Sequence, residues 1–583
     1  MVKTLARQIK EYIPSSILTP ICMVFEVVVE TIIPLLMASI IDDGIEKGNM
    51  QHILLIGAAM TGCAVFGLIF GLGGGIFGAK ASTGFAKNLR KAMYENIQTF
   101  SFSNIDKFST AGLVTRLTTD VTNVQNAYQM ILRMCFRAPF SLVLAMVFAF
   151  SINARLSMIY LVAVTVLAAL MTLIMSQAAK NFKLVFEKYD ELNASVQENV
   201  SAIRVVKAYV REDHENKKFS NAAQNIYRLF VKAETIICNV SPLMQGTIFT
   251  SILLISWVGA KMIITSGGTE LTTGELTSLL SYCMNILMNL MMLSMIFVMI
   301  TMSSASAKRI AEIINEKPDI TNPEDPDMTV SDGSIDFENV TFSYAASSGD
   351  PVLKNIDLSI KSGETIGIIG PTGSSKSSLV NLISRLYDVT EGCVKVGGKD
   401  VRSYDLETLR NSVAVVLQKN VLFSGTILDN LRWGNKDATD EECIEACRLA
   451  CADEFIEKMP DRYETRIEQG GTNVSGGQKQ RLCIARALLK KPKVLILDDS
   501  TSAVDTATDA KIRKTFAERI PDTTKLIIAQ RISSVCDADR IIVLDDGKVN
   551  GFGTHDELLK TNEIYREIYE EQTSGSGDFD ENN

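Results

Sequence analysis

The chain has 583 residues, of which 47% are hydrophobic and only 21% are charged, and its formal net charge is −9 at pH 7. This length exceeds that of an ordinary single domain, and the composition indicates a membrane part joined to a soluble part. Affinity for nucleic acid comes largely from basic surface that neutralises phosphates, so the acidic balance argues against a nucleic-acid partner.

The first half of the chain contains six apolar stretches long enough to cross the roughly 30 Å hydrocarbon core of a bilayer. They lie near residues 16–41, 53–79, 133–152, 156–178, 235–263 and 276–302. Lys and Arg are concentrated in the two long connections, about 80–132 and 179–234, and are scarce in the short ones. The positive-inside rule therefore predicts a multi-pass protein of the cell membrane, in contact with membrane lipid, with the long connections and both termini cytoplasmic.

Composition and periodicity also predict the domain boundaries. An all-α transmembrane domain is expected at residues 1–318, with helices that continue beyond the bilayer into the two long connections, and a Pro- and Asp-rich linker at 319–333. Residues 334–570 alternate short apolar strands with helical runs, which is the pattern of a cytoplasmic α/β domain. Residues 571–583 are polar and acidic, and we expect them to form a disordered tail.

A strand, a loop of small residues and the start of a helix are predicted within "TIGIIGPTGSSKSSLVNLI", Thr365–Ile383. Backbone N–H groups of such a loop bind phosphate oxygens, aided by the helix N-terminus. The P-loop pattern G-x-x-x-x-G-K-[ST] is met except that Ser375 occupies the position of the second glycine. Lys376 is placed to reach the β- and γ-phosphates of a nucleotide, and Ser377 to bind Mg²⁺. The candidate loop residues are Gly370, Pro371, Thr372, Gly373, Ser374, Ser375, Lys376, Ser377 and Ser378.

The stretch "VLILDDSTSAVD", Val494–Asp505, begins with four apolar residues that run directly into two carboxylates. A continuous apolar run is typical of a parallel strand that is buried on both faces. Asp498 and Asp499 then follow at the carboxyl end of this strand, where α/β sheets bind their ligands. With a nucleotide and its metal, the first carboxylate is expected to hold the metal and the second to activate water.

These motifs occur in a characteristic order. "NVSGGQKQR", Asn473–Arg481, lies about a hundred residues after the phosphate loop and directly precedes a helical run, and the acidic strand follows. Together the motifs resemble those of the ATP-binding cassette (ABC) family. With six preceding spans, nearly the whole chain resembles a half-transporter of the ABC exporter type, which implies export driven by ATP with Mg²⁺.

The resemblance implies roles for further residues. Tyr344 is similar in position to the aromatic residue that stacks on adenine, although a core tyrosine at a strand end is the alternative. Gln418 is similar to the glutamine that contacts the metal, and Asp498 to the metal-side carboxylate. The segments around Ser109–Arg116 and Ser201–Val210 resemble the helices that dock on the nucleotide-binding domains, the second of them on the partner's domain. The signature, which in this family faces the ATP of the other subunit, corresponds to Val474, Ser475, Gly476, Gly477 and Gln478, with Val474 in place of the usual Leu.

Three residues depart from the family's pattern on the face that binds the chain's own ATP. Asp499 replaces the catalytic Glu, Gln530 replaces the switch His, and Ser375 replaces a phosphate-loop glycine. The shorter Asp499 side chain withdraws its carboxylate by roughly 1.5 Å, and a misplacement of about 1 Å can lower a rate on the order of a hundredfold. We therefore expect a degenerate site that binds ATP but hydrolyses it poorly, against the alternative that each change is a tolerated variant.

The intact signature has the opposite implication. This chain retains the signature residues that face another subunit's ATP, and it departs from the family's pattern at three residues that face its own ATP. The resemblance is therefore to the degenerate-site subunit of a bacterial heterodimeric multidrug exporter. The expected partner is a homologous half-transporter that carries the catalytic Glu and the switch His.

Evidence on the substrate lies in the spans. Unbranched methionine side chains in the sixth span suit a permissive binding wall, and ordinary helix packing is the alternative. Carboxylates in the first span could attract cationic amphiphiles, or could pair with Arg133 or Arg137 of the third span. The asparagines of the sixth span could line the pathway or bond to a neighbouring helix. The candidate pathway residues are Glu26, Glu30, Asn285, Met288, Asn289 and Met292.

Drugs or other small lipophilic compounds are the expected substrates. Two alternatives remain open from the sequence: a nucleotide-gated regulatory subunit, and an exporter of a peptide or a lipid.

Overall fold

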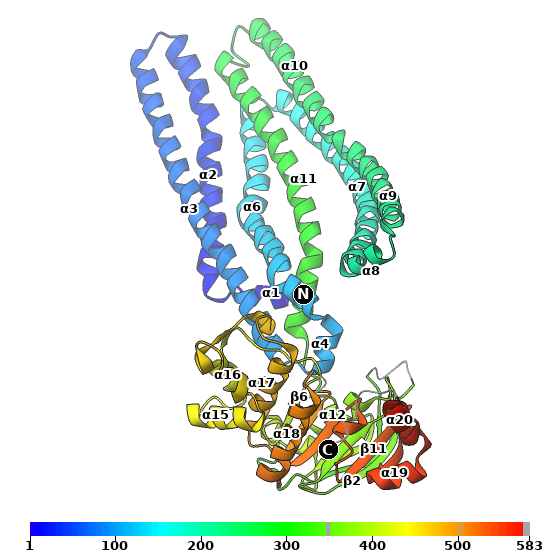
Figure 1. Ribbon diagram of the computed structural model, residues 1–583. Helices are drawn as coiled ribbons and strands as arrows, with labels where there is room; N and C mark the ends of the chain where they lie inside the picture. Colours follow the sequence, from blue (N-terminus) through cyan, green and yellow to red (C-terminus); the bar gives the residue numbers. More distant parts are fainter. Residues whose placement is uncertain (345–349, 501–502, 575–583) are drawn as a thin grey trace. The chain divides into compact units, whose positions relative to one another are not determined.

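The computed structural model describes residues 1–344, 350–500 and 503–574 (Figure 1). The chain divides into two compact units. The first comprises Met1–Gln98 and Thr110–Glu316, and the second comprises Thr99–Ser109 and Lys317–Asn583. A short segment from the first half of the chain thus belongs to the second unit.

The first unit is built from long helices. Within the residues that the structure describes, six helical stretches are long and apolar enough to cross a membrane, which confirms the six expected spans. The helices are α1 (Val2–Ala6), α2 (Ile13–Ser39), α3 (Met50–Gln98), α5 (Thr110–Thr115), α6 (Val121–Ile152), α7 (Ala154–Ser201), α8 (Ile203–Ala208), α9 (Glu212–Cys238), α10 (Val240–Ser266) and α11 (Thr273–Asn315), with π-helical turns at Ile40–Ile45 and Arg116–Asp120.

Local sequence signals set several helix ends in this unit. The Asn153 side chain caps α7 by accepting a hydrogen bond from the Leu156 amide (3.1 Å). Thr272 and Glu275 form a reciprocal capping box at the start of α11. Gly267 ends α10 in the left-handed conformation (φ 61°), which glycine adopts without steric cost. The short connections between spans are therefore encoded locally.

Two buried tyrosines attach α11 to its neighbours. The Tyr160 hydroxyl on α7 donates to the Leu279 carbonyl, and the Tyr282 hydroxyl donates to the Thr31 carbonyl on α2, both at 2.7 Å. Both rings are fully buried, and each hydroxyl thus has the partner that a buried polar group requires. Figure 1 shows α7 and α9 running together and joined through α8.

The second unit contains three sheets and the helices that cover them. Its strands are β1 (Ile335–Phe342), β2 (Leu353–Ile360), β3 (Thr365–Ile369), β4 (Glu391–Val396), β5 (Lys399–Asp400), β6 (Val413–Val416), β7 (Gly425–Thr426), β8 (Arg466–Ile467), β9 (Val494–Asp498), β10 (Thr524–Ile528), β11 (Arg540–Asp545) and β12 (Lys548–Gly553). Its helices are α4 (Phe102–Phe108), α12 (Lys376–Ile383), α13 (Leu406–Ser412), α14 (Ile427–Leu431), α15 (Asp440–Leu449), α16 (Asp453–Ile456), α17 (Gly476–Leu488), α18 (Thr506–Arg519), α19 (His555–Thr561) and α20 (Glu563–Ser574).

The six-stranded sheet of this unit has the order β12-β11-β3-β10-β9-β6. Its strands pair in parallel except for β12, which runs antiparallel to β11 at one edge. Alternate residues of β9 enter two separate cores: Val494 and Ile496 join one, and Leu495 and Leu497 join the other. Both faces are thus covered, which explains why this strand has no polar alternation. The expected order, an all-α membrane domain followed by an α/β domain, is confirmed.

The C-terminal helix α20 continues through Ser574. Residues 571–574 are therefore helical, although we expected them to belong to a disordered tail. The remainder of that expected tail, residues 575–583, lies outside the described residues.

Candidate nucleotide-binding site

The phosphate loop connects β3 to α12, and its backbone requires positive φ angles. Gly370 has φ 154°, and a Cβ atom there would lie 2.1 Å from the Leu544 carbonyl oxygen, so only glycine fits. Ser375 has φ 73° and ψ 25°, the left-handed region, and precedes the first residue of α12. A side chain in this region costs roughly 1–2 kcal/mol, which explains why glycine is typical of this position.

Lys376 lies folded over this loop. Its ammonium group donates to the carbonyl oxygens of Gly370 (2.8 Å) and Pro371 (2.9 Å) and to the Ser374 hydroxyl (3.2 Å). Burial lowers the pKa of Lys376, and the carboxylates Asp498 and Asp499 oppose that shift. All three donors of the ammonium group are therefore directed at the loop, where a phosphate would give them a charged acceptor.

The structure brings Ser377 and Asp498 together at the end of β9. The Ser377 hydroxyl donates to Asp498 Oδ1 at 3.0 Å, and the Asp498 side chain is almost fully buried. Burial, with a smaller contribution from Asp499, raises the pKa of Asp498. Mg²⁺ in nucleotide sites takes one or two carboxylates and completes its octahedron with phosphates and water. This buried carboxylate beside a hydroxyl fits such an ion, because a cation would compensate the desolvated charge.

Asp499 lies between two glutamines. Gln530 Nε2 donates to Asp499 Oδ2 at 2.9 Å, and Gln418 Nε2 approaches the same oxygen at 3.4 Å. The three residues come from the ends of β9, β10 and β6, which meet at one edge of the parallel sheet. Asp499 itself has φ 48°. Asp499 and Gln530, both predicted from the sequence as site residues, are therefore direct hydrogen-bond partners.

Tyr344 is half exposed, with 48% of its surface accessible, so it is not a core tyrosine. Its hydroxyl shares a 2.8 Å hydrogen bond with the Ser378 hydroxyl on α12. Its ring packs edge-on against Tyr387, with centroids 5.0 Å apart and planes at 89°. One ring face of Tyr344 beside the phosphate loop suits stacking on a flat base.

Tyr387 was not identified from the sequence, and its environment includes α4. The Tyr387 hydroxyl donates to Asp106 Oδ2 at 2.7 Å, and its ring contacts Phe102 edge-on at 5.9 Å. Helix α4, which directly precedes the expected segment Ser109–Arg116, therefore lies against Tyr387 within the second unit. Ser101 caps α4 and Ser109 ends it with φ 52°, which makes α4 a separate helix. No motif marks these contacts in the sequence.

The signature forms the N-terminus of α17. Ser475 and Gln478 make a reciprocal capping box, with the Gln478 amide donating to Ser475 Oγ at 3.3 Å. Gly477 lies against the Ala503 carbonyl, which a Cβ atom would approach to 2.8 Å. Gly476 occupies the same first turn, and Val474 packs partly into the core. The helix N-terminus carries the partial positive charge that attracts phosphate.

The carboxylates of the first span are paired. Arg137 on α6 donates to Glu26 Oε1 at 2.9 Å and to Glu30 Oε2 at 2.8 Å, both on α2. Of the two pairings that the sequence left open, the structure selects Arg137. The arginine fork can satisfy two carboxylates at once, which reduces their attraction for cationic compounds.

Most methionines of α11 are exposed. Met284, Met288 and Met291 are exposed, whereas Met292 and Asn285 are half-buried. Asn289 Nδ2 donates to the Ser141 hydroxyl on α6 at 2.9 Å and to the Asn285 carbonyl at 2.8 Å. Asn289 therefore bonds to a neighbouring helix, and the exposed methionines are available to a ligand or a second chain.

Sequence comparison agrees with both halves of this structure. Residues 16–311 match the family described as the ABC transporter transmembrane region, and residues 353–502 match the family described as ABC transporter. The uncharacterized ABC transporter ATP-binding protein YfiB of Bacillus subtilis is 37% identical over 560 residues, which cover 96% of each chain. The ATP-dependent lipid A-core flippase of Desulfotalea psychrophila is 32% identical over 491 residues, which cover 83% of this chain and 84% of that one.

The fold also matches a solved structure. A bacterial Atm1-family ABC exporter with ATP bound superposes with a TM-score of 0.81 at 23% identity, covering 97% of this chain and 99% of that chain. The chain therefore belongs to the ABC transporter family, as a half-transporter that joins one multi-pass membrane domain to one ATP-binding domain.

Proposed function

We propose that this chain is the degenerate-site half of a heterodimeric ABC exporter. Its own phosphate loop would hold ATP and Mg²⁺ with little turnover, and its signature would serve the ATP that a partner half hydrolyses. The hydrogen bond between Gln530 and Asp499 carries this proposal, because it joins the two residues that replace the catalytic Glu and the switch His.

The chemistry of this pair supports slow hydrolysis. A glutamine amide can donate to a phosphate oxygen, but it stays neutral and cannot carry the positive charge that a histidine can take on. Asp499 Oδ2 already accepts from Gln530 and lies 3.4 Å from Gln418 Nε2, so this oxygen of the shorter carboxylate is occupied by two side-chain amides. Loss of a general base typically lowers a rate by about 10²–10⁴.

The metal and the ATP phosphates have a separate set of residues. Ser377 and Asp498 would hold Mg²⁺ together with Gln418, and Lys376 would bind the β- and γ-phosphates. None of these departs from the ABC pattern. Binding without efficient turnover is the behaviour that this combination favours.

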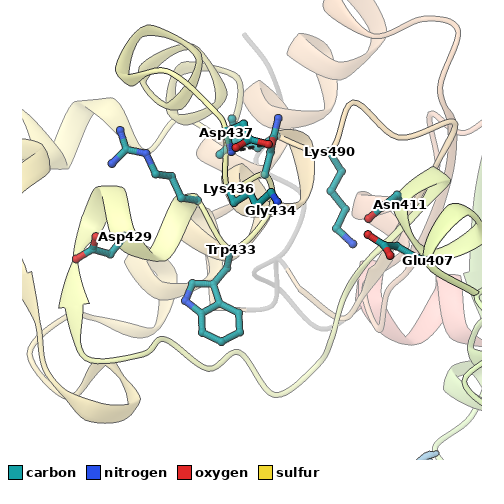
Figure 2. A pocket seen from close by; sticks show the side chains of 11 residues that line it. Glu407, Asn411, Asp429, Trp433, Gly434, Lys436, Asp437 and Lys490 are labelled. Carbon is teal, nitrogen blue, oxygen red and sulfur yellow. Dashed lines mark hydrogen bonds between the residues drawn. The ribbon is translucent and has the colours of Figure 1, made fainter. Parts of the chain in front are cut away.

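A hollow in the second unit suits a partner half. Trp433 is 62% exposed and stacks on Phe423, with ring centroids 4.1 Å apart. The hollow beside it has a volume of about 740 Å³, and its lining residues come from α13, from α14 and the loop after it, and from the segment after α17 (Figure 2). In the first unit, α8 is followed by the exposed Tyr209 and Val210. We propose that the partner's counterpart of α8 docks in this hollow, as the ABC exporter arrangement implies.

The degenerate site is tested by ATP turnover of the chain alone and together with an ABC half-transporter encoded by a neighbouring gene. We expect negligible turnover alone and clear turnover by the pair. Activity of the pair should survive Lys376→Ala in this chain and be lost when the partner's catalytic glutamate is replaced by glutamine. Brisk turnover by the isolated chain would contradict the proposal.

The docking hollow is tested separately, by replacing Trp433 with a photo-crosslinking phenylalanine analogue. Irradiation of the assembled complex should join this chain to its partner half, whereas the same analogue at Asp546, on the turn between β11 and β12, should not. If irradiation gives only crosslinks within one chain and none to the partner, the partner does not dock at Trp433.

For the substrate, the exposed methionines of α11 support a lipophilic compound. Polarizable, unbranched side chains adapt to varied apolar surfaces. Lipid transport is the second candidate, favoured by the likeness to the lipid A-core flippase. Stimulation of the pair's ATPase by a panel of lipophilic drugs and by lipids, in proteoliposomes, separates the two. The ATP-binding domain and both termini are proposed to be cytoplasmic, from the distribution of Lys and Arg.

A further inference from the structure

The C-terminal helix α20 is attached to the loop that carries Gln530. Gln572 Nε2 donates to the Gln530 carbonyl at 2.8 Å, and Gln572 Oε1 accepts from the Ile532 amide at 2.8 Å. One side-chain carboxamide therefore bonds to the backbone on both sides of Arg531. The carboxamide offers one donor and one acceptor to this backbone, as a neighbouring strand does in a parallel β-sheet.

The helix that presents Gln572 is itself firmly held. Tyr565 is fully buried, and its hydroxyl lies 2.7 Å from His555 Nδ1 on α19. Ile568 and Tyr569 pack against the same core that contains the fully buried Ile532. The backbone of α20 is thus anchored in the core independently of Gln572, so Gln572 can position the backbone of the Gln530 loop.

A continuous chain of bonds leads from this helix to the nucleotide site. Gln572 holds the backbone of Gln530, and the side chain of Gln530 donates to Asp499. A cavity of about 350 Å³ adjoins this loop and is lined by Asp499, Gln530 and Ser534 among others, so open space is available for the loop to move. We infer that Gln572 is a positioning residue: it sets the loop so that the Gln530 amide faces Asp499 and the terminal phosphate of ATP.

This inference rests on ATP binding by the domain and on the position of Gln530, and not on slow turnover. The positioning role of Gln572 can therefore be disproved while the degenerate site is upheld. The degenerate site can likewise be disproved while the role of Gln572 is upheld. Its readouts are amide exchange and ATP affinity, neither of which requires hydrolysis.

The test uses the full chain in lipid nanodiscs, with and without Mg²⁺-ATP. Gln572→Ala should speed hydrogen exchange at the Ile532 amide and its neighbours about fivefold, the factor that one hydrogen bond of ordinary strength supplies. Gln572→Glu keeps the oxygen that accepts from the Ile532 amide. It replaces the donor to the Gln530 carbonyl with a second carboxylate oxygen, which the carbonyl oxygen repels. It should therefore retain protection of that amide while weakening ATP binding.

A double-mutant cycle separates positioning from general stability. Gln572→Ala should lower ATP affinity about fivefold in the natural chain and have no further effect in a Gln530→Ala background, because the two residues act in series. Thr573→Ala is the matched control, since among the residues that the structure describes its hydroxyl bonds to the Tyr569 and Glu570 carbonyls within α20, and it should change neither readout. Unchanged exchange in Gln572→Ala, unchanged ATP affinity, or an equal loss in both backgrounds would overturn the inference.

Discussion

The side-chain amide of Gln530 donates a 2.9 Å hydrogen bond to the carboxylate of Asp499, and this links residues that follow two neighbouring parallel strands, β10 and β9. In a site with Glu and His, the corresponding groups would face an attacking water and the γ-phosphate. Here the Gln530 amide bonds to the Asp499 carboxylate, and Gln418 Nε2 lies 3.4 Å from the same carboxylate oxygen. The two residues that we propose to be degenerate therefore form one hydrogen-bonded unit.

Restoring both residues should restore turnover. Asp499→Glu combined with Gln530→His should raise ATP hydrolysis by this chain's site about a hundredfold, because the longer carboxylate recovers roughly 1.5 Å of reach and the imidazole can carry charge. Each single change should recover much less, since the two side chains are bonded to each other. The measurement is phosphate release by the pair in which the partner's catalytic glutamate is replaced by glutamine. If the double variant is as slow as the natural chain, the degenerate residues do not limit turnover.

Ser375→Gly should stabilise the phosphate loop. The left-handed conformation at this position costs a side chain about 1 kcal/mol, which glycine avoids. We expect a higher melting temperature of the full chain in detergent and tighter ATP binding, because the backbone can then approach phosphate more closely. Ser109→Gly is the control, since Ser109 also has a positive φ (52°) but lies outside the loop, and it should leave ATP affinity unchanged. Equal ATP affinities for Ser375→Gly and the natural chain would show that the Cβ atom does not hinder phosphate.

Asp505 should make stability depend on pH in the acid range. Hydrogen bonds from the backbone and hydroxyl of Thr508 lower the pKa of Asp505, which caps α18. A lowered pKa means that the stabilisation is present above the ordinary aspartate pKa and is lost as the pH falls through the lowered value. Asp505→Asn should keep the cap and flatten this loss, whereas Asp505→Ala should lower stability by about 1 kcal/mol at neutral pH. Melting temperatures between pH 3 and 7 check the prediction, and parallel curves for all three chains would refute it.

Arg137→Ala should destabilise the membrane domain. It would leave Glu26 and Glu30 without their shared partner, and breaking a partly buried ion pair costs about 1–3 kcal/mol, between the values for exposed and buried pairs. Arg137→Lys should be intermediate, because a single ammonium group cannot reproduce the fork that binds both carboxylates. Glu30→Gln is the control and should have the smallest effect, because Glu30 is the more exposed of the two acids. The thermal aggregation temperature of the purified full chain gives the order of the three variants. If all three aggregate at the same temperature as the natural chain, the pairing contributes nothing.

Much of the nucleotide site could be predicted from the sequence, because its motifs are short and contiguous. The strand β9 was recognised from four consecutive apolar residues, and Lys376, Ser377 and Asp498 lie where the motif places them. The segment that contacts the ATP-binding domain was harder to predict from the sequence. The sequence indicated Ser109–Arg116, and no local signal marked the contact of the preceding helix α4 with Tyr387, which exists only in the folded unit.

The sequence by itself determined the six spans and the α/β domain, since hydropathy and motif spacing are properties of consecutive residues. Only the tertiary structure decided which arginine pairs with Glu26 and Glu30, that Tyr387 joins Tyr344, and that Gln572 holds the loop of Gln530. Each of these contacts joins residues from different elements. Such partners are chosen by the packing of helices and strands, which fixes distances that no local pattern encodes.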